Sequence, residues 1–355
     1  MKILRFSPEI RSSYIERFEH APKATTFYLE RTYLDDEILK DRPEYQQVSV
    51  RQLFGTLLRS EHDVVELPEP LWLKMWPLTF GLAVTARIGA KLRGRTVRLS
   101  TYAIENADVR ALFSWFPRFT PDWLRIKVLW LASIPGIYLM DRIAFGTEGA
   151  AETFRAALPE SFHRRLRLKS CVVPPLPERQ WDTTVDKSGF LFLGSFEARK
   201  GVPELLAAWR EYRNLGGNGT LTMIGMGPLE NLVHQAAIRD AITVKIAPPR
   251  AQIHQALSRA KILVLLSQPE GRWREQIGLP ILEGIAHGCR VVSTDQTGIA
   301  DWLSSHNHVV VPTSCSTEKV AEKFLQIESE PFAPMPDSWS TPNGRAKAEE
   351  WLCFG

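Results

Sequence analysis

Short apolar runs recur through the second half of the chain, and a stretch with helical character separates each run from the next. Strands of a parallel sheet are buried on both faces, so they consist of nearly continuous apolar residues and are joined through helices. The repeat therefore predicts a doubly wound α/β domain, in which ligands bind beyond the carboxyl ends of the strands. The runs cover residues 190–194, 220–225, 243–247, 262–266, 290–294 and 308–312.

The first half of the chain predicts a second domain of the same class. Residues 1–6, 63–67 and 96–101 have the pattern of strands, and residues 82–92 have that of a helix. The resulting order of strand, helix and strand favours a mostly parallel sheet covered by helices. A chain of 355 residues is long enough to bury a core in each of two domains.

Proline marks the predicted boundary between the domains. Three prolines within residues 172–177 indicate a stiff, extended connection. The predicted parts are an N-terminal domain over residues 1–172, a proline-rich linker over 173–187, a C-terminal domain over 188–330 and a tail with a helix over 331–355.

Composition and charge exclude several classes of protein. With 44% hydrophobic and 24% charged residues the chain is globular rather than disordered. A net charge of +4 suits an anionic ligand or an acidic membrane surface but is too weak to predict a nucleic-acid partner. The four cysteines form no C-x-x-C pair, which favours reduced thiols in a cytoplasmic protein without structural zinc. The first residues lack the apolar segment of a signal peptide, and the longest apolar stretch, Val128–Met140, is too short to span a bilayer.

Two glutamates eight residues apart follow the run at residues 262–266. Glu275 falls in an irregular loop and Glu283 just inside a helix, whose entry at Leu279-Pro280 suits a first turn that tolerates proline. Gly278 lets the backbone approach a ligand, and the free N–H groups of a helix start attract an anion such as phosphate. The arrangement suits a sugar linked to a nucleoside diphosphate. The alternative is a plain strand, loop and helix with two solvated glutamates.

The segment Glu275–Gly284, followed by Ala286–Ser293, resembles the E-x7-E element of retaining glycosyltransferases of the group 1 or family 4 type. The departures from the commonest residues are Gln276, Ile277, Gly284 and Arg290. The resemblance implies an α/β protein with the GT-B fold, in which two Rossmann-like doubly wound domains face each other across a cleft. It covers residues 189–312 by motif and the N-terminal half by architecture only. In this family a last helix returns to the N-terminal domain, which is implied here with Trp351 as the packing residue.

Two glycine-containing loops extend the resemblance. Gly194–Gly201 resembles the family pattern Gly-Arg-x-x-x-x-Lys-Gly, in which the arginine and the lysine hold the donor diphosphate. Lys200 matches the lysine, whereas Ser195 stands in place of the arginine. A lysine–phosphate pair roughly 4 Å apart contributes about 4 kcal/mol before desolvation, so Lys200 is predicted to matter greatly. Gly225-Met-Gly227-Pro is similar to the family's loop near the nucleotide. A solvated Arg-Lys turn before a helix is the alternative for Lys200.

The resemblance implies a retaining, metal-independent glycosyltransferase of the hexosyl type, which moves a sugar from a nucleoside-diphosphate sugar to a glycan or a lipid-linked acceptor in polysaccharide biosynthesis. It implies no cofactor, no metal and no nucleic-acid partner. Lys200 would neutralise the diphosphate and Glu283 would accept hydrogen bonds from the ribose. Glu275 would position the sugar with the amides of Gly278 and Leu279. The candidate catalytic residues are Lys200 and Glu275, and the implied donor-binding residues are Gly194, Ser195, Lys200, Gly225, Gly227, Glu275, Gly278, Leu279 and Glu283.

The acceptor side is less strongly marked. Ligands are expected beyond the strand at residues 96–101, where Tyr102, Glu105 and Asn106 are the candidates for acceptor contact. A helix is predicted to begin near Ala107, so a helix N-cap is the alternative role for Asn106.

Tryptophans and basic residues suggest a membrane-proximal acceptor. The segment 70–80 contains Trp72 and Trp76 and suits a membrane interface, with a core edge or an apolar acceptor groove as the alternatives. Basic residues within 91–98 and 164–169 agree with peripheral contact at the inner face of a membrane, although a solvated face is their usual role.

Two other functions fit the same residues. A sugar-nucleotide epimerase or a phosphorylase of GT-B fold would share the nucleotide or phosphate site without a glycan acceptor. A non-catalytic GT-B partner subunit is the second alternative, because Ser195 replaces a family arginine and the loop Ser7–Ser13 has no glycine. The base, the sugar, the acceptor, the linkage and the oligomeric state remain open at this point.

Overall fold

The computed structural model describes residues 1–32, 34, 36–106, 120–180, 185–271, 273–331 and 343–355. The chain forms two compact units, and each is described separately below. The first unit contains Met1–Pro175 and Asn343–Gly355, and the second contains Leu176–Pro342. The division falls within the predicted linker.

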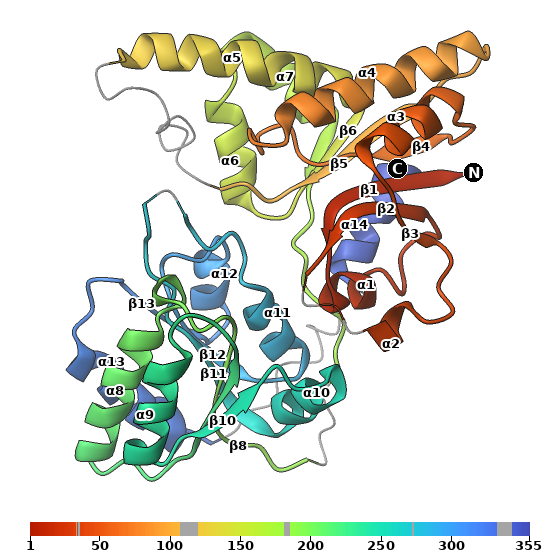
Figure 1. Cartoon of the computed structure of the whole chain (residues 1–355). Helices are drawn as coiled ribbons and strands as arrows, with labels where there is room; N and C mark the ends of the chain where they lie inside the picture. The colour runs from red at the N-terminus through yellow and green to blue at the C-terminus, as the bar shows by residue number, and fades with distance from the viewer. Residues whose placement is uncertain (33, 35, 107–119, 181–184, 272, 332–342) are drawn as a thin grey trace. The chain divides into compact units, whose positions relative to one another are not determined.

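A parallel sheet with strand order β3-β2-β1-β4-β5-β6-β7 forms the centre of the first unit (Figure 1). The strands are β1 (Ile3–Ile10), β2 (Thr25–Arg31), β3 (Tyr45–Gln47), β4 (Val64–Glu66), β5 (Arg98–Ala103), β6 (Arg142–Phe145) and β7 (Ser170–Val172). The parallel sheet is as predicted, but β2, β3 and β7 were not. β3 and β7 form the two edges of the sheet and lack a clear apolar run, whereas β2, next to one edge, has only a short run over residues 27–29.

Helices cover both faces of this sheet. They are α1 (Ser12–Arg17), α2 (Asp36–Leu39), α3 (Val50–Arg59), α4 (Trp76–Leu92), α5 (Asp122–Leu139), α6 (Glu148–Ala156), α7 (Glu160–Leu168) and α14 (Gly344–Cys353). Leu4 and Phe6 of β1 point into the main core with residues from α3 to α7. Ile3, which alternates with them, packs against Cys353 of α14 on the opposite face.

Two predicted boundaries in this unit were wrong. The first strand continues to Ile10, because its pairing with β2 extends as far as the pair Ile10 and Arg31. The residues expected to form a polar loop at 7–13 are therefore largely strand and the start of α1. The helix predicted over residues 82–92 starts already at Trp76, with Pro77 in its first turn.

The second unit has a parallel sheet with strand order β10-β9-β8-β11-β12-β13. Its strands are β8 (Ser188–Leu193), β9 (Leu221–Gly225), β10 (Thr243–Ile246), β11 (Ala260–Leu265), β12 (Arg290–Thr294) and β13 (Val309–Val311). Each of the apolar runs found in the sequence is a strand, so the doubly wound domain is confirmed. The strand order reverses between β8 and β11, and such a switch point is where ligands bind in open α/β sheets.

Helices of the second unit follow the strands in alternation. They are the short 3-10 helix η2 (Ala198–Lys200) and the α-helices α8 (Val202–Asn214), α9 (Glu230–Asp240), α10 (Arg250–Arg259), α11 (Leu279–Ala286), α12 (Ala300–Ser305) and α13 (Thr317–Ser329). Aromatic rings join α8, α13 and the sheet. The ring of Phe190 lies 5.3 Å from Trp209, 5.5 Å from Tyr212 and 5.3 Å from Phe324. These buried contacts hold β8 in place for the loop that follows it.

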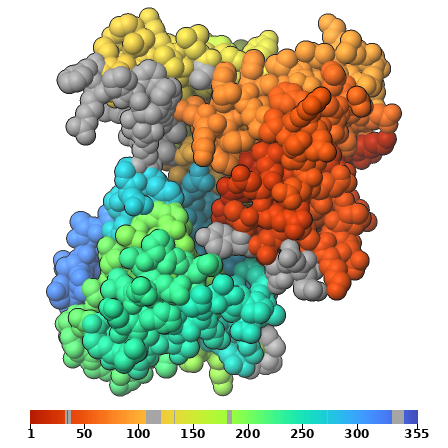
Figure 2. Space-filling model, in the orientation of Figure 1, coloured from red at the N-terminus to blue at the C-terminus, as the bar shows by residue number. Residues whose placement is uncertain are grey.

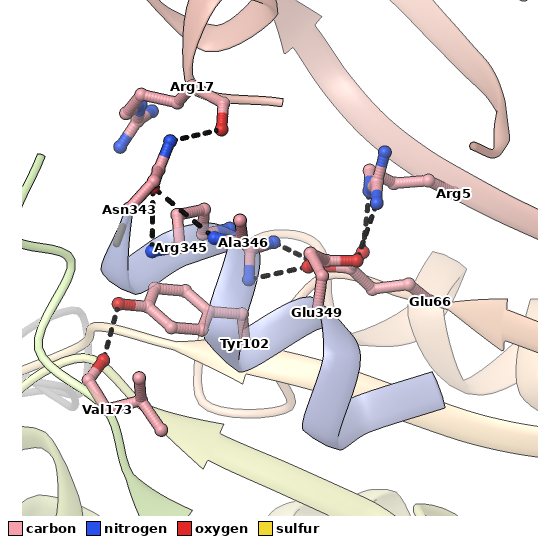
Figure 3. Close-up of polar contacts among 9 residues, drawn as sticks. All are labelled: Arg5, Arg17, Glu66, Tyr102, Val173, Asn343, Arg345, Ala346 and Glu349. Carbon is pink, nitrogen blue, oxygen red and sulfur yellow. Dashed lines mark hydrogen bonds and ion pairs between the residues drawn. The ribbon is translucent and has the colours of Figure 1, made fainter. Parts of the chain in front are cut away.

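The helix at the end of the chain belongs to the first unit and carries a buried charge cluster (Figure 3). Arg345 and Glu349 of α14 meet Arg5 of β1 and Glu66 of β4, which define the α14 charge cluster. Each carboxylate binds both guanidinium groups, with the nitrogen–oxygen distances between 2.5 and 2.7 Å. Trp351, predicted as the packing residue, is only partly buried.

Candidate functional site

The loops after the neighbouring strands β8 and β9 pack closely against each other where glycines occupy their ends. A Cβ atom on Gly225 would lie 1.9 Å from the carbonyl oxygen of Gly194, so only glycine fits at the end of β9. In the next turn Phe196 donates its backbone N–H to the carbonyl of Met226 at 2.8 Å. The structure thereby brings together four residues of the predicted donor site, Gly194, Ser195, Gly225 and Gly227.

The loop after β8 also packs against the end of β11. Gly201 has φ +73°, and a Cβ there would lie 1.9 Å from the carbonyl oxygen of Leu266. The backbone N–H of Gln268 donates to the carbonyl of Arg199 at 2.9 Å. These contacts fix the position of Lys200, which ends η2, beside the loop that begins at Ser267.

Lys200 and Glu275, the two candidate catalytic residues, form an ion pair. Nζ of Lys200 lies 2.5 Å from Oε2 of Glu275, and the side chains are 13% and 10% exposed. The hydroxyl of Ser267 donates to the same carboxylate oxygen at 3.2 Å. The ring of Trp273 lies 4.9 Å from Nζ of Lys200 and 4.5 Å from Cζ of Arg199, within the range of cation–π attraction.

Helix α11 begins with free backbone donors next to this pair. Gly278 precedes the helix with φ +83°, a conformation that favours glycine, and Pro280 lies in the first turn. Within the described ranges of the chain the N–H groups of Gly278 and Leu279 donate to no acceptor. The loop before them is fixed from outside, since the carbonyl of Glu275 accepts from the N–H of Gly298 at 3.0 Å. A helix start with unused amides can bind an anion.

Glu283, the predicted ribose ligand, is already paired. It lies within α11, and Arg250 at the start of α10 binds both of its carboxylate oxygens, at 2.9 and 3.2 Å. Both side chains are mostly buried. Each carboxylate oxygen keeps a second lone pair, so Glu283 can still accept a hydrogen bond from a hydroxyl. The sequence prediction gave Arg250 no partner, because nothing in the sequence indicates that the starts of α10 and α11 meet.

A buried histidine lies one turn further along α11. Nδ1 of His287 lies 2.9 Å from the carbonyl oxygen of Glu283, and its Nε2 lies 3.1 Å from Nδ1 of His254. Burial lowers the pKa of His287 to about 4. Within the ranges that the structure describes, no group of three or more His, Cys, Asp or Glu side chains could hold a metal ion.

Tyr102, a predicted acceptor residue, serves mainly to pack α14 in the first unit. Its hydroxyl donates to the carbonyl of Val173 at 3.1 Å, and its ring lies 3.9 Å from Cζ of Arg345 (Figure 3). Burial raises the pKa of the Tyr102 hydroxyl well above its usual value. An acceptor contact would therefore have to compete with this packing role.

Glu105 and Asn106 lie beside a buried carboxyl group that the sequence prediction missed. Oε2 of Glu69 accepts the backbone N–H groups of Ile104 at 3.1 Å and Glu105 at 3.0 Å. Burial, together with the nearby charge of Glu105, raises the pKa of Glu69 to about 8. Asn106 is buried, and the helix expected from Ala107 lies outside the described residues. The signal for it in the sequence is its place after the carboxyl end of β4, where ligands are expected, between two prolines.

Part of the chain is similar in sequence to a known protein family. Residues 178–345 match the family described as glycosyl transferases group 1. The matched range contains all the residues of the predicted donor site. No curated protein sequence matches the chain at a significant level.

Solved structures share the fold over almost the whole chain. Anabaena HepE, in complex with UDP and glucose, matches with a TM-score of 0.60 and 14% identity over 99% of this chain and 94% of that chain. The lipopolysaccharide outer core galactosyltransferase WaaB matches with a TM-score of 0.58 and 16% identity over 99% and 97%. WaaG, a glycosyltransferase involved in lipopolysaccharide biosynthesis, matches with 0.57 and 12% over 99% and 100%. The chain therefore has the GT-B fold, as predicted.

Proposed function

We propose that this chain is a retaining, metal-independent glycosyltransferase of the family 4 type. It would transfer a hexose from a nucleoside-diphosphate sugar to a glycan or a lipid-linked acceptor at the inner face of a membrane, as a step of polysaccharide biosynthesis. The observation that carries the proposal is the pair of Lys200 and Glu275 beside the unused amides at the start of α11. The match to group 1 glycosyl transferases and the fold shared with a UDP-bound structure support it.

The donor would bind by exchange of an existing ion pair. Lys200 is held by Glu275 in the free protein, so a diphosphate must replace that carboxylate as the partner of the ammonium group. The amides of Gly278 and Leu279 would add neutral donors that need no exchange. Glu275, once released, is free to accept hydrogen bonds from hydroxyl groups of the donor sugar. Hydrogen bonds to a charged group contribute about 1.5–3 kcal/mol each, which is enough to fix the orientation of a sugar.

The chemical step would depend on stabilisation of the leaving diphosphate. Charge develops on the diphosphate as the bond to the sugar breaks, and Lys200 with the start of α11 lies where that charge can be neutralised. Ser195 stands in place of the family arginine and adds no positive charge. Lys200 is the cation from this loop that contacts Glu275. Neighbouring Arg199 instead pairs with Glu197.

Thermal unfolding with nucleoside diphosphates tests the donor site. A ligand at 100 times its dissociation constant stabilises by about 2.7 kcal/mol, which is roughly 5–10 °C in the melting temperature of a unit this size. We expect one of UDP, GDP, ADP, CDP and dTDP to shift the wild type and the Lys319→Ala control, but not Lys200→Ala. Lys319 is an exposed lysine of α13 in the same unit. A shift of Lys200→Ala equal to that of the wild type would refute the assigned role.

Product analysis separates this function from its alternatives. Incubation of the matching nucleotide sugar with candidate glycan and lipid acceptors, with and without EDTA, should give a glycosylated product in both cases. Loss of the product on addition of EDTA would contradict a metal-independent reaction. Conversion of the donor without a glycosylated product would favour an epimerase or a phosphorylase. No binding of any nucleotide would favour a non-catalytic subunit.

A further inference from the structure

Helix α5 exposes several large apolar side chains on the surface of the first unit. Its inner side carries Leu129, Ser133 and Ile137, which are buried in the first unit. Its outer side carries Leu131, which is 75% exposed, and Tyr138, which is 54% exposed. A helix that is apolar on all sides is normally buried on all sides. Here one side faces outward along the edge of the unit that α4 also forms (Figures 1 and 2).

Three of the exposed residues form a stripe along the helix. Leu124, Leu131 and Tyr138 are spaced seven residues apart, which is close to two helical turns, so they lie on the same side of α5. Trp123 and Ile126 are exposed as well, but they lie on other sides of the first turns. The helix has 18 residues and is thus about 27 Å long. None of the described helices is long and apolar enough to cross a membrane, so this stripe could only lie along one.

Cations from two helices, α5 and α7, lie beside aromatic side chains of α5. Nζ of Lys127 lies 5.1 Å from the ring of Trp123, and Cζ of Arg165 on α7 lies 3.9 Å from the ring of Tyr138. Arg164 and Arg167 of α7 are exposed as well. In the part of the chain that the structure describes, these four cations form no ion pair.

Leu168, at the end of α7, extends the apolar area and is 79% exposed. Helix α7 is fixed to α5 because Nζ of Lys169 donates to the carbonyl of Met140 at 2.7 Å. The outward sides of α5 and α7 are called the α5–α7 face from here on.

We propose that the α5–α7 face docks on an anionic lipid bilayer. Exposed aliphatic and aromatic side chains can enter the boundary between headgroups and acyl chains, while lysine and arginine reach the phosphates beside them. A second copy of the chain fits the face less well, because two copies related by a two-fold axis would bring their unpaired cations together. The proposal places the contact on α5 and α7 beside the predicted segment of Trp72 and Trp76, in which Trp76 packs against Gly136 of α5 and Trp72 is exposed.

Vesicle co-sedimentation tests the proposal and needs neither donor nor acceptor, so its failure would leave the proposed glycosyl transfer untouched. We expect the wild type to bind phosphatidylcholine vesicles that contain phosphatidylglycerol, and to bind pure phosphatidylcholine far more weakly. Binding should weaken as salt rises, because salt screens the attraction between the cations and the lipid phosphates; the Debye length is about 10 Å at 0.1 M.

Two variants test the apolar and the charged parts separately. Leu131→Glu should lower the partition coefficient more than tenfold, because the energy of burying a leucine is lost and a charge is added. Arg164→Gln with Arg167→Gln should lower it about fivefold for each cation removed. The matched controls are Ile238→Glu on α9, which is 90% exposed in the second unit, and Lys319→Gln with Lys323→Gln on α13.

Three results would overturn the proposal. The first is failure of the wild type to bind the anionic vesicles at low salt, and the second is binding of both face variants as tight as that of their controls. The third is a wild-type dimer in light scattering that Leu131→Glu converts to a monomer, which would assign the face to a second copy. All the substituted side chains are exposed, and a thermal melt of each variant establishes that it is folded.

Discussion

The α14 charge cluster gives the sharpest stability prediction. Arg5, Glu66, Arg345 and Glu349 are all nearly inaccessible to solvent, and two positive charges balance two negative ones. Glu66→Gln keeps the size of the side chain but leaves the cluster with one uncompensated positive charge. Loss of one partner from a buried ion pair costs about 3–5 kcal/mol, because the remaining charge stays desolvated.

The structure sets the expected size of the effect. Glu66 contacts Arg345 at 2.5 Å and Arg5 at 2.7 Å, so the substitution weakens two contacts at once. The pKa values show which carboxylate depends most on these contacts. Burial opposes the ionisation of Glu66, yet the guanidinium groups of Arg345 and Arg5 lower its pKa to about 2, whereas burial together with the charge of Glu66 raises the pKa of Glu349. For a unit of this size about 2–4 °C of melting temperature corresponds to each kcal/mol, so we expect a fall of roughly 6–20 °C.

An exposed ion pair in the same unit provides the control. Nζ of Lys2 lies 2.7 Å from Oε2 of Glu61, a similar distance, but these side chains are 66% and 62% exposed. Glu61→Gln should therefore leave the melting temperature nearly unchanged. Differential scanning calorimetry would measure both variants, and limited proteolysis would report release of α14. Equal shifts for Glu66→Gln and Glu61→Gln would refute the argument that burial makes the cluster essential.

Three further predictions concern stability. In thermal melts Gly201→Ala should destabilise the second unit far more than Gly271→Ala. Both glycines have positive φ, but only at Gly201 would the new Cβ lie 1.9 Å from a carbonyl oxygen. Equal losses of melting temperature would contradict this reasoning. The raised pKa of Glu69, about 8, favours the neutral acid in the folded state, so stability should fall as pH rises from about 4.5 to 8, by up to about 1.4 kcal/mol per pH unit. Denaturant titrations should show this fall in the wild type and not in Glu69→Gln. Burial lowers the pKa of His287 to about 4 and that of His308 to about 3, so the second unit should lose stability as pH falls from about 6.5 to 4. A flat profile over that range in urea denaturation would count against it.

The second unit could be predicted from sequence because its central strands are buried on both faces. These strands are compact apolar runs, and the loops beyond β8 and β9 contain the glycines that close packing requires. The first unit was harder, since Tyr45–Gln47 and Ser170–Val172 pair only at the edges of the sheet. Strands of this kind depend on a neighbour distant in the sequence, and their own residues give little indication of it.

Contacts between distant segments account for what the sequence could not supply in the candidate site. Lys200 and Glu275 were both predicted, yet their direct pairing follows only from the packing of Gly201 on the end of β11. The pairing of Arg250 with Glu283 joins two helix starts that no sequence pattern connects. The exposed stripe on α5 was not predicted either, although it lies within a single helix. Its apolar residues match those of a buried helix, and only the structure shows which of them face outward.

The ion pair of Lys200 and Glu275 leads to a prediction that separates binding from transfer. If the proposed function holds, Glu275 competes with the donor diphosphate for the ammonium group of Lys200, so the free site is locally neutral. Glu275→Gln would release Lys200 while keeping a side chain of the same shape, and the hydroxyl of Ser267 could still donate to it. The matching nucleoside diphosphate should then bind at least tenfold more tightly, since about 1.4 kcal/mol corresponds to that factor and the charge interaction is worth more.

Transfer of the sugar should fall in the same variant, because the carboxylate that would position the sugar is gone. Isothermal titration calorimetry with the diphosphate and a product assay with the donor measure the two effects independently. Weaker binding of the diphosphate by Glu275→Gln would mean that Glu275 orients Lys200 toward the ligand instead of competing for it. The ion pair would then be a prepared part of the site, and the donor would bind without the exchange proposed above.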